Sequence, residues 1–274
     1  MKLTVPPDNG LGLLARLCYF LSNQVMWRLI MSGRYLHMRC GIVLLLLLAG
    51  CQATDPMKPA DIIIQDAHSG GNVVRFNHAG TLLASGGWEG RVNLWHLPDG
   101  KTGASWKAHE GSVNGLAFMK NDMNLISAGY DGVLVQWQTD GGLLQRIQTP
   151  APITAMAQDG VQIITGHLDG TVRIWDAQSL LPVVEHELHR NAVKAVASAG
   201  EKGYLASAGA DSEVYLITPY GSPRALQSPP TDAWTLAFSP DGEWLAGGGW
   251  FRLFRWSIPA GRLSLLYLGS HSVY

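Results

Sequence analysis

Short apolar segments alternate with glycine-containing turns from residue 61 to the end of the chain. In residues 127–137 (SAGYDGVLVQW), the end of one apolar segment is followed by a turn that carries an aspartate and by a second apolar segment closed by a tryptophan. Similar stretches occur at residues 85–95, 165–175, 207–217 and, one residue shorter, 247–256. Segments of this length bounded by glycine and aspartate are typical of β-strands joined by tight turns. We therefore predict an all-β chain built from a recurring unit.

The spacing of the closing residue predicts the architecture of this unit. The closing residue recurs every 38 to 42 residues, at Trp95, Trp137, Trp175, Ile217 and Trp256. A repeat of this length suits four short strands, and it contains too many glycines for a helical repeat. In the second unit, the glycines around Asp131 permit the positive φ of a turn, and the aspartate can accept hydrogen bonds from the amides of that turn.

The second unit resembles the repeat of the WD-repeat β-propeller family at His109, Ser127, Asp131 and Trp137. Five units in register carry this resemblance over residues 61–270, although the literal Trp-Asp pair occurs only once. The resemblance implies a β-propeller of four-stranded antiparallel blades. It also implies that the four side chains form a hydrogen-bonded set, in which each bond contributes about 1 kcal/mol net.

The expected hydrogen-bonded set differs from blade to blade. Its members are His68, Ser85 and Trp95 in the first unit, where Glu89 takes the aspartate position; His109, Ser127, Asp131 and Trp137 in the second; Thr165, Asp169 and Trp175 in the third, whose TPAPIT lead-in has no histidine; His189, Ser207 and Asp211 in the fourth, which closes with Ile217; and Trp256 alone in the fifth, with Gly247 at the serine position. We expect the fifth blade to depend on apolar packing instead.

The resemblance also implies a candidate face for binding a partner. In the family, the residue before the turn acid and the residue at the start of each inner strand lie on one rim beside the central channel. The predicted partner-binding residues on this rim are Trp88, Tyr130, Leu168, Trp250, Trp234, Asn114 and Lys194. Exposed aromatic patches mark interaction surfaces. The alternative is that these rings pack on neighbouring loops, because single surface aromatics are common.

The composition and the remaining motifs favour a binding protein over an enzyme. The formal net charge is −1 and 15% of residues are charged, so no basic stripe indicates nucleic acid. His109, Ser127 and Asp131 are the side chains of a hydrolase triad, but the same trio recurs at repeat spacing without a nucleophile elbow. The segment HELH that ends at His189 lacks the histidine spacing of a zinc-protease helix. We therefore expect no catalytic residue, cofactor or metal.

Residues before the repeats resemble a bacterial lipoprotein signal. An apolar run follows Arg39 and ends in Leu-Ala-Gly before Cys51, and cleavage there leaves a cysteine that carries acyl chains. The run is short for a membrane span. An ordinary signal peptide and an uncleaved anchor are the alternatives. By analogy with lipoprotein sorting in Gram-negative bacteria, Gln52 at the position after the cysteine, rather than an aspartate, implies a lipid anchor in the outer membrane that faces the periplasm.

These features divide the chain into three parts. Residues 1–50 are an upstream extension and signal peptide, with Met31 or Met38 as the expected start. Residues 51–60 are a lipidated tether, and residues 61–274 are the propeller. No cysteine follows Cys51, which excludes disulfides from the repeats.

The last residues repeat the beginning of a sixth unit, because His271 lies 82 residues after His189. Since seven blades are usual in the family, we expect a truncated product and an incomplete ring with unpaired strand edges. A closed ring of five blades is the alternative. We also expect residues 62–65 to form an outer strand that completes the last blade.

These observations lead to one preferred function and two alternatives. We expect a membrane-tethered scaffold that binds a protein or peptide without catalysis. The first alternative is a fragment of a larger propeller enzyme or redox protein whose active domain lies beyond Tyr274. The second is a cytoplasmic scaffold whose apolar run is only an anchor.

Overall fold

The computed structural model describes residues 63–64, 67–219, 221–250 and 252–266. The chain divides into two units, Met1–Ala60 and Asp61–Tyr274, and all described residues belong to the second. The predicted signal peptide, the lipidated Cys51, the tether and the beginning of a sixth unit at His271 lie outside the described residues. Among the residues that the structure does describe, no helix is long and apolar enough to cross a membrane.

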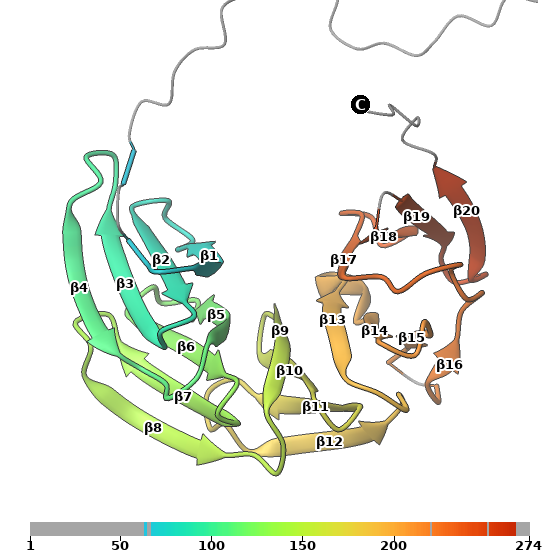
Figure 1. Cartoon of the computed structure of the whole chain (residues 1–274), viewed down its shortest axis with the longest axis horizontal. Coiled ribbons are helices and arrows are strands. Elements are labelled where there is room, and N and C mark those ends of the chain that lie inside the picture. The colour runs from blue at the N-terminus through green and yellow to red at the C-terminus, as the bar shows by residue number, and fades with distance from the viewer. Residues whose placement is uncertain (1–62, 65–66, 220, 251, 267–274) are drawn as a thin grey trace, which may run out of the picture. The chain divides into compact units, whose positions relative to one another are not determined.

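Twenty strands in the described part of the chain form five four-stranded antiparallel sheets, which we call blades 1 to 5 (Figure 1). Blade 1 contains β1 (Gly71–Phe76), β2 (Leu82–Gly87), β3 (Arg91–His96) and β4 (Thr102–Lys107). Blade 2 contains β5 (Val113–Phe118), β6 (Asn124–Gly129), β7 (Val133–Gln138) and β8 (Leu143–Gln148). Blade 3 contains β9 (Ile153–Asp159), β10 (Gln162–His167), β11 (Thr171–Asp176) and β12 (Pro182–Glu187).

The last two blades follow the same order. Blade 4 contains β13 (Val193–Ser198), β14 (Leu205–Gly209), β15 (Val214–Ile217) and β16 (Arg224–Ala225), with a 3₁₀ turn at Gly200–Lys202. Blade 5 contains β17 (Thr235–Phe238), β18 (Trp244–Gly249), β19 (Arg252–Ser257) and β20 (Arg262–Leu266). In every blade the chain passes from the inner to the outer strand without a crossover, which confirms the predicted all-β fold of four-stranded blades.

The turn between the second and third strands has a residue with positive φ in blades 1 to 4. Gly90, Gly132 and Gly170 occupy this position with φ of 76°, 74° and 86°, and Ser212 adopts 61° in blade 4. At Gly170 a Cβ atom would overlap the carbonyl oxygen of His189. Glycine is therefore needed there both for its conformation and for its lack of a side chain.

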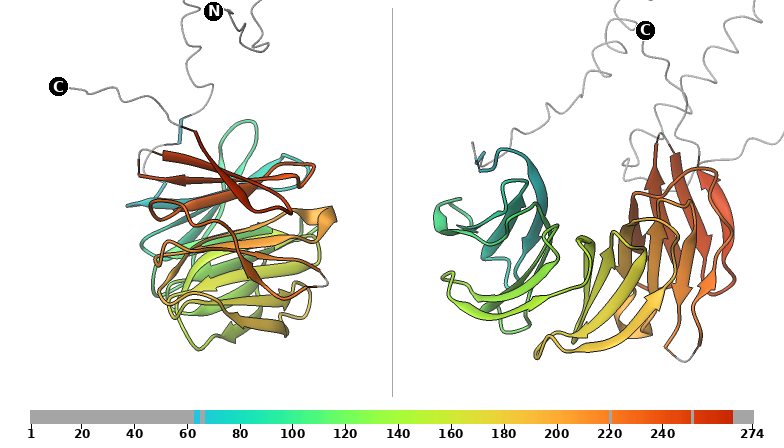
Figure 2. Two further views of the ribbon diagram at one scale, coloured as in Figure 1. Left: turned by 90° about the vertical axis from the view of Figure 1, so that its right-hand side faces the viewer. Right: turned by 60° about the horizontal axis from the view of Figure 1, so that its bottom comes forward.

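The core lies between successive blades. Leu116 and Phe118 of β5 pack in one cluster with Ala84 and Leu94 of blade 1, and similar clusters join the later blades. Inner strands of successive blades contact one another, and the sheets stack face to face (Figure 2). Burial of each such side chain stabilises the fold by about 1.5 to 3 kcal/mol.

Blade 1 has one face that no other described blade covers. Val74 and Phe76 of β1 are 57% and 64% exposed, whereas Leu116 and Phe118 at the equivalent positions of β5 are 1% and 2% exposed. An outer strand that completes the last blade was predicted at residues 62–65. Its two described positions, 63 and 64, belong to no strand, so the expectation of a strand there is wrong at those positions.

Candidate interaction face

The four predicted side chains of blade 2 form a continuous hydrogen-bonded set. Trp137 Nε1 donates to Ser127 Oγ at 2.9 Å, and Ser127 Oγ lies 2.7 Å from His109 Nε2. Because the Asp131 carboxylate can only accept, His109 Nδ1 donates to Asp131 Oδ1 at 3.0 Å, and Nε2 of the neutral imidazole tautomer then accepts from the Ser127 hydroxyl. Burial raises the pKa of Asp131, but hydrogen bonds from His109 and a backbone amide outweigh it and hold that pKa below its usual value.

This geometry gives Ser127 a structural role despite its likeness to a hydrolase triad. The Ser127 side chain is fully buried, and its oxygen already accepts the indole N–H of Trp137. A nucleophilic serine needs a free approach for the substrate and an oxyanion hole beside it. The set therefore joins the second and third strands of the blade to the loop before the first.

Blades 1 and 4 keep the same arrangement with one substitution each. In blade 1, His68 Nε2 lies 2.8 Å from Ser85 Oγ, and its Nδ1 lies 2.5 Å from Glu89, which takes the aspartate position. Trp95 Nε1 donates to Ser85 Oγ at 2.9 Å. In blade 4, His189 lies 2.8 Å from Ser207 Oγ and 3.0 Å from Asp211 Oδ1. The rings of Tyr215 and His189 meet edge to face at 5.1 Å between centroids.

Blade 3 uses His167, a histidine that was not among the predicted members of the set. Trp175 Nε1 donates to Thr165 Oγ1 at 2.8 Å, and Thr165 Oγ1 lies 2.8 Å from Nε2 of His167 on the same strand. His167 Nδ1 donates to the carbonyl of Ala151 at 3.1 Å. Burial lowers the pKa of His167 to about 4 from its usual 6.5, although this hydrogen bond raises it. His167 is therefore neutral at pH 7.

A sequence signal for His167 does exist. Blades 1, 2 and 4 have glycine at its position, and a Cβ atom there would overlap the histidine that comes from the loop. In blade 3 the loop histidine is replaced by Thr149, and the strand supplies the imidazole instead. Asp169 consequently bonds Thr171 and Arg173 rather than a histidine, so its predicted membership of the blade 3 set is wrong.

Blade 5 is stabilised mainly by apolar packing around Trp256 in place of the hydrogen-bonded set. This side chain is fully buried and lies 5.9 Å from the ring of Phe254, between centroids. At the serine position, a Cβ atom on Gly247 would lie 3.0 Å from the Trp256 ring. The indole N–H donates to the carbonyl of Gln227 at 2.8 Å, so one hydrogen bond accompanies the apolar packing.

The turns that carry the predicted partner-binding residues lie at one end of all the blades. In blades 1 to 4, the residue before the turn acid donates its backbone N–H to the carbonyl of the residue just before the inner strand of the same blade. The pairs are Trp88 with Gly70, Tyr130 with Ser112, Leu168 with Pro152 and Ala210 with Ala192, at 2.8 to 3.0 Å. In blade 5 the direction is reversed, and Trp234 donates to Gly248 at 2.7 Å. We call the surface formed by these turns and strand starts the aromatic rim.

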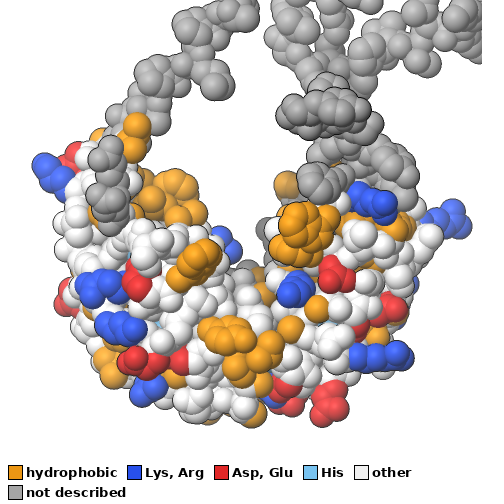
Figure 3. All heavy atoms as spheres, viewed as in Figure 1, with side chains coloured by type: hydrophobic (Ala, Val, Ile, Leu, Met, Phe, Trp, Pro, Cys, Tyr) orange, Lys and Arg blue, Asp and Glu red, His pale blue; other side chains and the backbone are white. Residues whose placement is uncertain are grey.

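Several apolar side chains of the aromatic rim are open to solvent. The exposed fractions are 67% for Trp88, 45% for Tyr130, 42% for Leu168, 49% for Trp234 and 62% for Trp250. Figure 3 shows exposed hydrophobic side chains in separate clusters on one face of this unit, with Lys or Arg side chains beside some of them. The rings of Trp234 and Trp250 meet edge to face at 5.1 Å, and Lys194 Nζ lies 5.9 Å from the Trp234 ring centroid.

Asn114 has a different role from the one predicted. Side chains at its position reach the backbone carbonyl of the next inner strand, with Asn72 donating to Val113 at 2.8 Å, Asn114 to Ile153 at 2.7 Å and Thr154 to Val193 at 2.7 Å. These bonds tie blades 1, 2 and 3 each to the following blade. The side-chain amide of Asn114 therefore holds blade 2 to blade 3, because a short polar side chain at this position can reach the adjacent strand.

The comparison with protein families agrees with this geometry. A profile of the WD domain, G-beta repeat family matches residues 62–96, 100–138, 141–176 and 224–256, which make up more than half of the chain. The chain belongs to the WD-repeat family. The matched segments leave out WD blade 4 from β13 to β15, where Ile217 replaces the closing tryptophan although His189, Ser207 and Asp211 keep their geometry.

Curated WD-repeat relatives match shorter parts of the chain. Guanine nucleotide-exchange factor SEC12 of Rattus norvegicus is 43% identical over 68 residues, which cover 25% of this chain and 16% of that protein. WD repeat-containing protein 91 of Danio rerio is 38% identical over 66 residues, covering 24% and 9%. Angio-associated migratory cell protein of Canis lupus familiaris is 26% identical over 151 residues, covering 52% and 34%. The chain thus spans about a third of the last protein's length and less of the other two.

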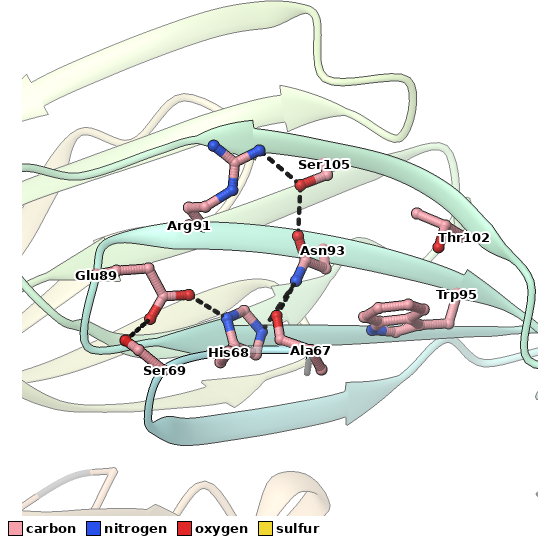
Figure 4. A pocket seen from close by; sticks show the side chains of 9 residues that line it. All are labelled: Ala67, His68, Ser69, Glu89, Arg91, Asn93, Trp95, Thr102 and Ser105. Carbon is pink, nitrogen blue, oxygen red and sulfur yellow. Dashed lines mark hydrogen bonds and ion pairs between the residues drawn. The ribbon is translucent and has the colours of Figure 1, made fainter. Parts of the chain in front are cut away.

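A cavity of about 390 Å³ lies beside the WD set of blade 1 (Figure 4). The polar groups that line it bond one another: Ser69 donates to Glu89 at 2.9 Å, Arg91 to Ser105 at 2.8 Å and Ser105 to Asn93 at 2.6 Å. This network holds the outer strand β4 to β3. Within the described residues, no group of three or more His, Cys, Asp or Glu side chains is placed to bind a metal ion.

Proposed function

We propose that this chain is a lipid-anchored WD-repeat scaffold that binds a protein or peptide on its aromatic rim and does not itself catalyse a reaction. WD repeats are typical of protein-interaction scaffolds that are generally non-catalytic. The observation that carries the proposal is the aromatic rim, because Trp88, Trp234 and Trp250 are about half or more exposed on turns and strand starts that share one end of the blades. Aromatic side chains in such positions dominate the energy of many interfaces.

The rim can be tested with a double substitution. Trp88→Ala combined with Trp250→Ala should reduce recovery of a specific cross-linked partner at least tenfold when the protein is captured from its native membranes. The matched control is Met123→Ala, because this side chain is equally exposed but lies in the turn at the other end of blade 2. Equal recovery of every partner by wild type and the double variant would contradict the proposed face.

The proposed anchor depends on Cys51. Its support is the apolar run that ends in Leu-Ala-Gly before this cysteine, and Gln52 favours the outer membrane with the propeller in the periplasm. Two or more acyl chains give stable anchoring where one gives only marginal binding. Cys51→Ala should abolish incorporation of radiolabelled palmitate, whereas Cys40→Ala should leave it unchanged. Labelling that persists without Cys51 would refute the anchor.

A further inference from the structure

One corner of the aromatic rim departs from the pattern that the other blades share. The residue at the second position of the inner strand is Asn72, Asn114 or Thr154 in blades 1 to 3, and each donates a hydrogen bond to the next blade. In blade 4 this position is Lys194, and in blade 5 the equivalent residue is Trp234, directly before β17. Lys194 makes no such hydrogen bond with a described residue, and blade 5 has no following described blade that Trp234 could reach. Positions that break a local structural pattern are where functional constraints are expected.

The corner formed by Lys194, Trp234 and Trp250 combines one cation with two aromatic rings. The Lys194 ammonium lies 5.9 Å from the Trp234 ring centroid, and the two tryptophan rings meet at an interplanar angle of 77°. Both rings remain about half or more exposed. An edge-to-face pair leaves ring surface available to an apolar side chain while fixing the orientation of the rings.

Charged groups around this corner leave the ammonium available to a carboxylate. Lys194 forms no ion pair with any described residue, since no described carboxylate oxygen lies within 4.0 Å of it. Three acids also lie at this end of blades 4 and 5, and each accepts a hydrogen bond from another group, which is His189 for Asp211, Ser212 for Asp232 and Ser228 for Glu213.

Two further cations lie at the same end of blades 4 and 5. Arg190 lies in the loop before β13 and donates its backbone N–H to Asp211, and Arg252 begins β19 directly after the turn. Both side chains are exposed, and neither forms an ion pair with a described residue. Three cations without an ion pair at the same end of the blades as two exposed rings favour a ligand that brings both negative charge and an apolar side chain.

We infer that the corner of Lys194, Trp234 and Trp250 binds an acidic peptide segment in which a carboxylate lies next to a large apolar side chain. The carboxylate pairs with the Lys194 ammonium, and the apolar side chain packs on the tryptophan rings. This inference rests on the proposed function, because it assigns a partner chemistry to one part of the aromatic rim.

Binding of three labelled peptides to the purified chain tests the inference. The probe is a fluorescein-labelled peptide in which glutamates flank a phenylalanine, and its counterparts carry glutamine or lysine in place of glutamate. Fluorescence anisotropy should show the glutamate peptide binding about tenfold more tightly than the glutamine peptide, and the lysine peptide binding least. The preference should weaken as salt is raised, because the contact is partly exposed.

Substitutions test whether Lys194 and Trp234 cause the preference for the glutamate peptide. Lys194→Asn places the side chain of blades 1 and 2 at this position, so the fold is retained, and it should remove the preference for glutamate over glutamine. Lys120→Asn changes an exposed lysine at the other end of blade 2 and should leave the preference intact. Trp234→Ala should weaken the glutamate and glutamine peptides alike, because the rings contact the shared phenylalanine.

The possible failures are distinguishable. Equal affinity for the glutamate and glutamine peptides, or a preference that survives Lys194→Asn, would overturn the acidic partner. Capture that still depends on Trp88 and Trp250 would in that case leave the proposed function standing with a partner of different chemistry.

Discussion

His167 shows how one residue can replace another from a different part of the repeat. The strand position that carries His167 is glycine wherever a loop histidine fills the same space, so an imidazole reaches the serine or threonine hydroxyl in four of the five blades. The sequence predicts the serine, aspartate and tryptophan positions from their spacing. It does not reveal the exchange in blade 3, because spacing alone says nothing about which side chain fills a shared volume.

The buried, neutral state of His167 predicts a dependence of stability on pH. Its pKa is about 4 in the fold and about 6.5 in the unfolded chain, so only the unfolded state takes up a proton between these values. The free energy of unfolding should therefore be unaffected by this group above pH 6.5 and should fall by roughly 3 kcal/mol as the pH drops from 6.5 to 4.

Urea unfolding at several pH values measures this contribution. In His167→Gln the same decline should be shallower, because the proton uptake of this side chain is lost. His78→Gln is the control, since His78 is an exposed histidine at the other end of blade 1. Identical pH slopes in wild type and His167→Gln would show that His167 does not carry the effect.

At the scale of the elements, the turns define each blade more strictly than the strands do. The strands follow from apolar periodicity, which is why their existence could be predicted from sequence in all five blades. The expected strand at residues 62–65 failed at its two described positions because a short apolar run does not specify a neighbour to pair with. The turn before the third strand, by contrast, combines positive φ with a close backbone contact at Gly170.

Two glycine substitutions distinguish the strain of a positive φ from the steric overlap of an added Cβ atom. Gly170→Ala should lower the free energy of unfolding by more than about 2 kcal/mol, because the new Cβ overlaps the His189 carbonyl in addition to the strain at φ of 86°. Gly80→Ala, at φ of 68° with no atom within 4 Å of the new Cβ, should cost only about 1 kcal/mol. Thermal and urea unfolding give both values. Equal destabilisation of the two variants would argue against the clash at Gly170.

At the scale of the five blades together, a side chain on an inner strand is buried only where another blade packs against its face of the sheet. Equivalent phenylalanines differ completely in exposure, since Phe118 lies between blades 1 and 2 and Phe76 lies on the face of blade 1 that no described blade covers. The residues of the aromatic rim could be predicted from sequence only in part. The exposed tryptophans followed from the repeat register, whereas the commitment of Asn114 to the next blade depends on a contact across 39 residues.

This difference predicts opposite results for the same substitution. Phe118→Ala should destabilise the unit by about 3 to 5 kcal/mol, because it leaves a cavity between two blades. Phe76→Ala should change the free energy of unfolding by less than about 1 kcal/mol, because the ring is already largely in water. Urea unfolding compares them directly. A large loss in Phe76→Ala would mean that another segment covers blade 1 in solution.

The chain of bonds formed by Asn72, Asn114 and Thr154 ends before blade 5, and this interruption has a consequence for motion. The junction of blades 4 and 5 holds Lys194 where the preceding junctions have a short polar tie, and blade 5 also lacks the histidine and serine of its own set. Native-state hydrogen exchange should therefore find the amides of β18 and β19 opening earlier than those of β6 and β7. Earlier opening of blade 5 would let Trp234 and Trp250 shift relative to Lys194 across the junction of blades 4 and 5.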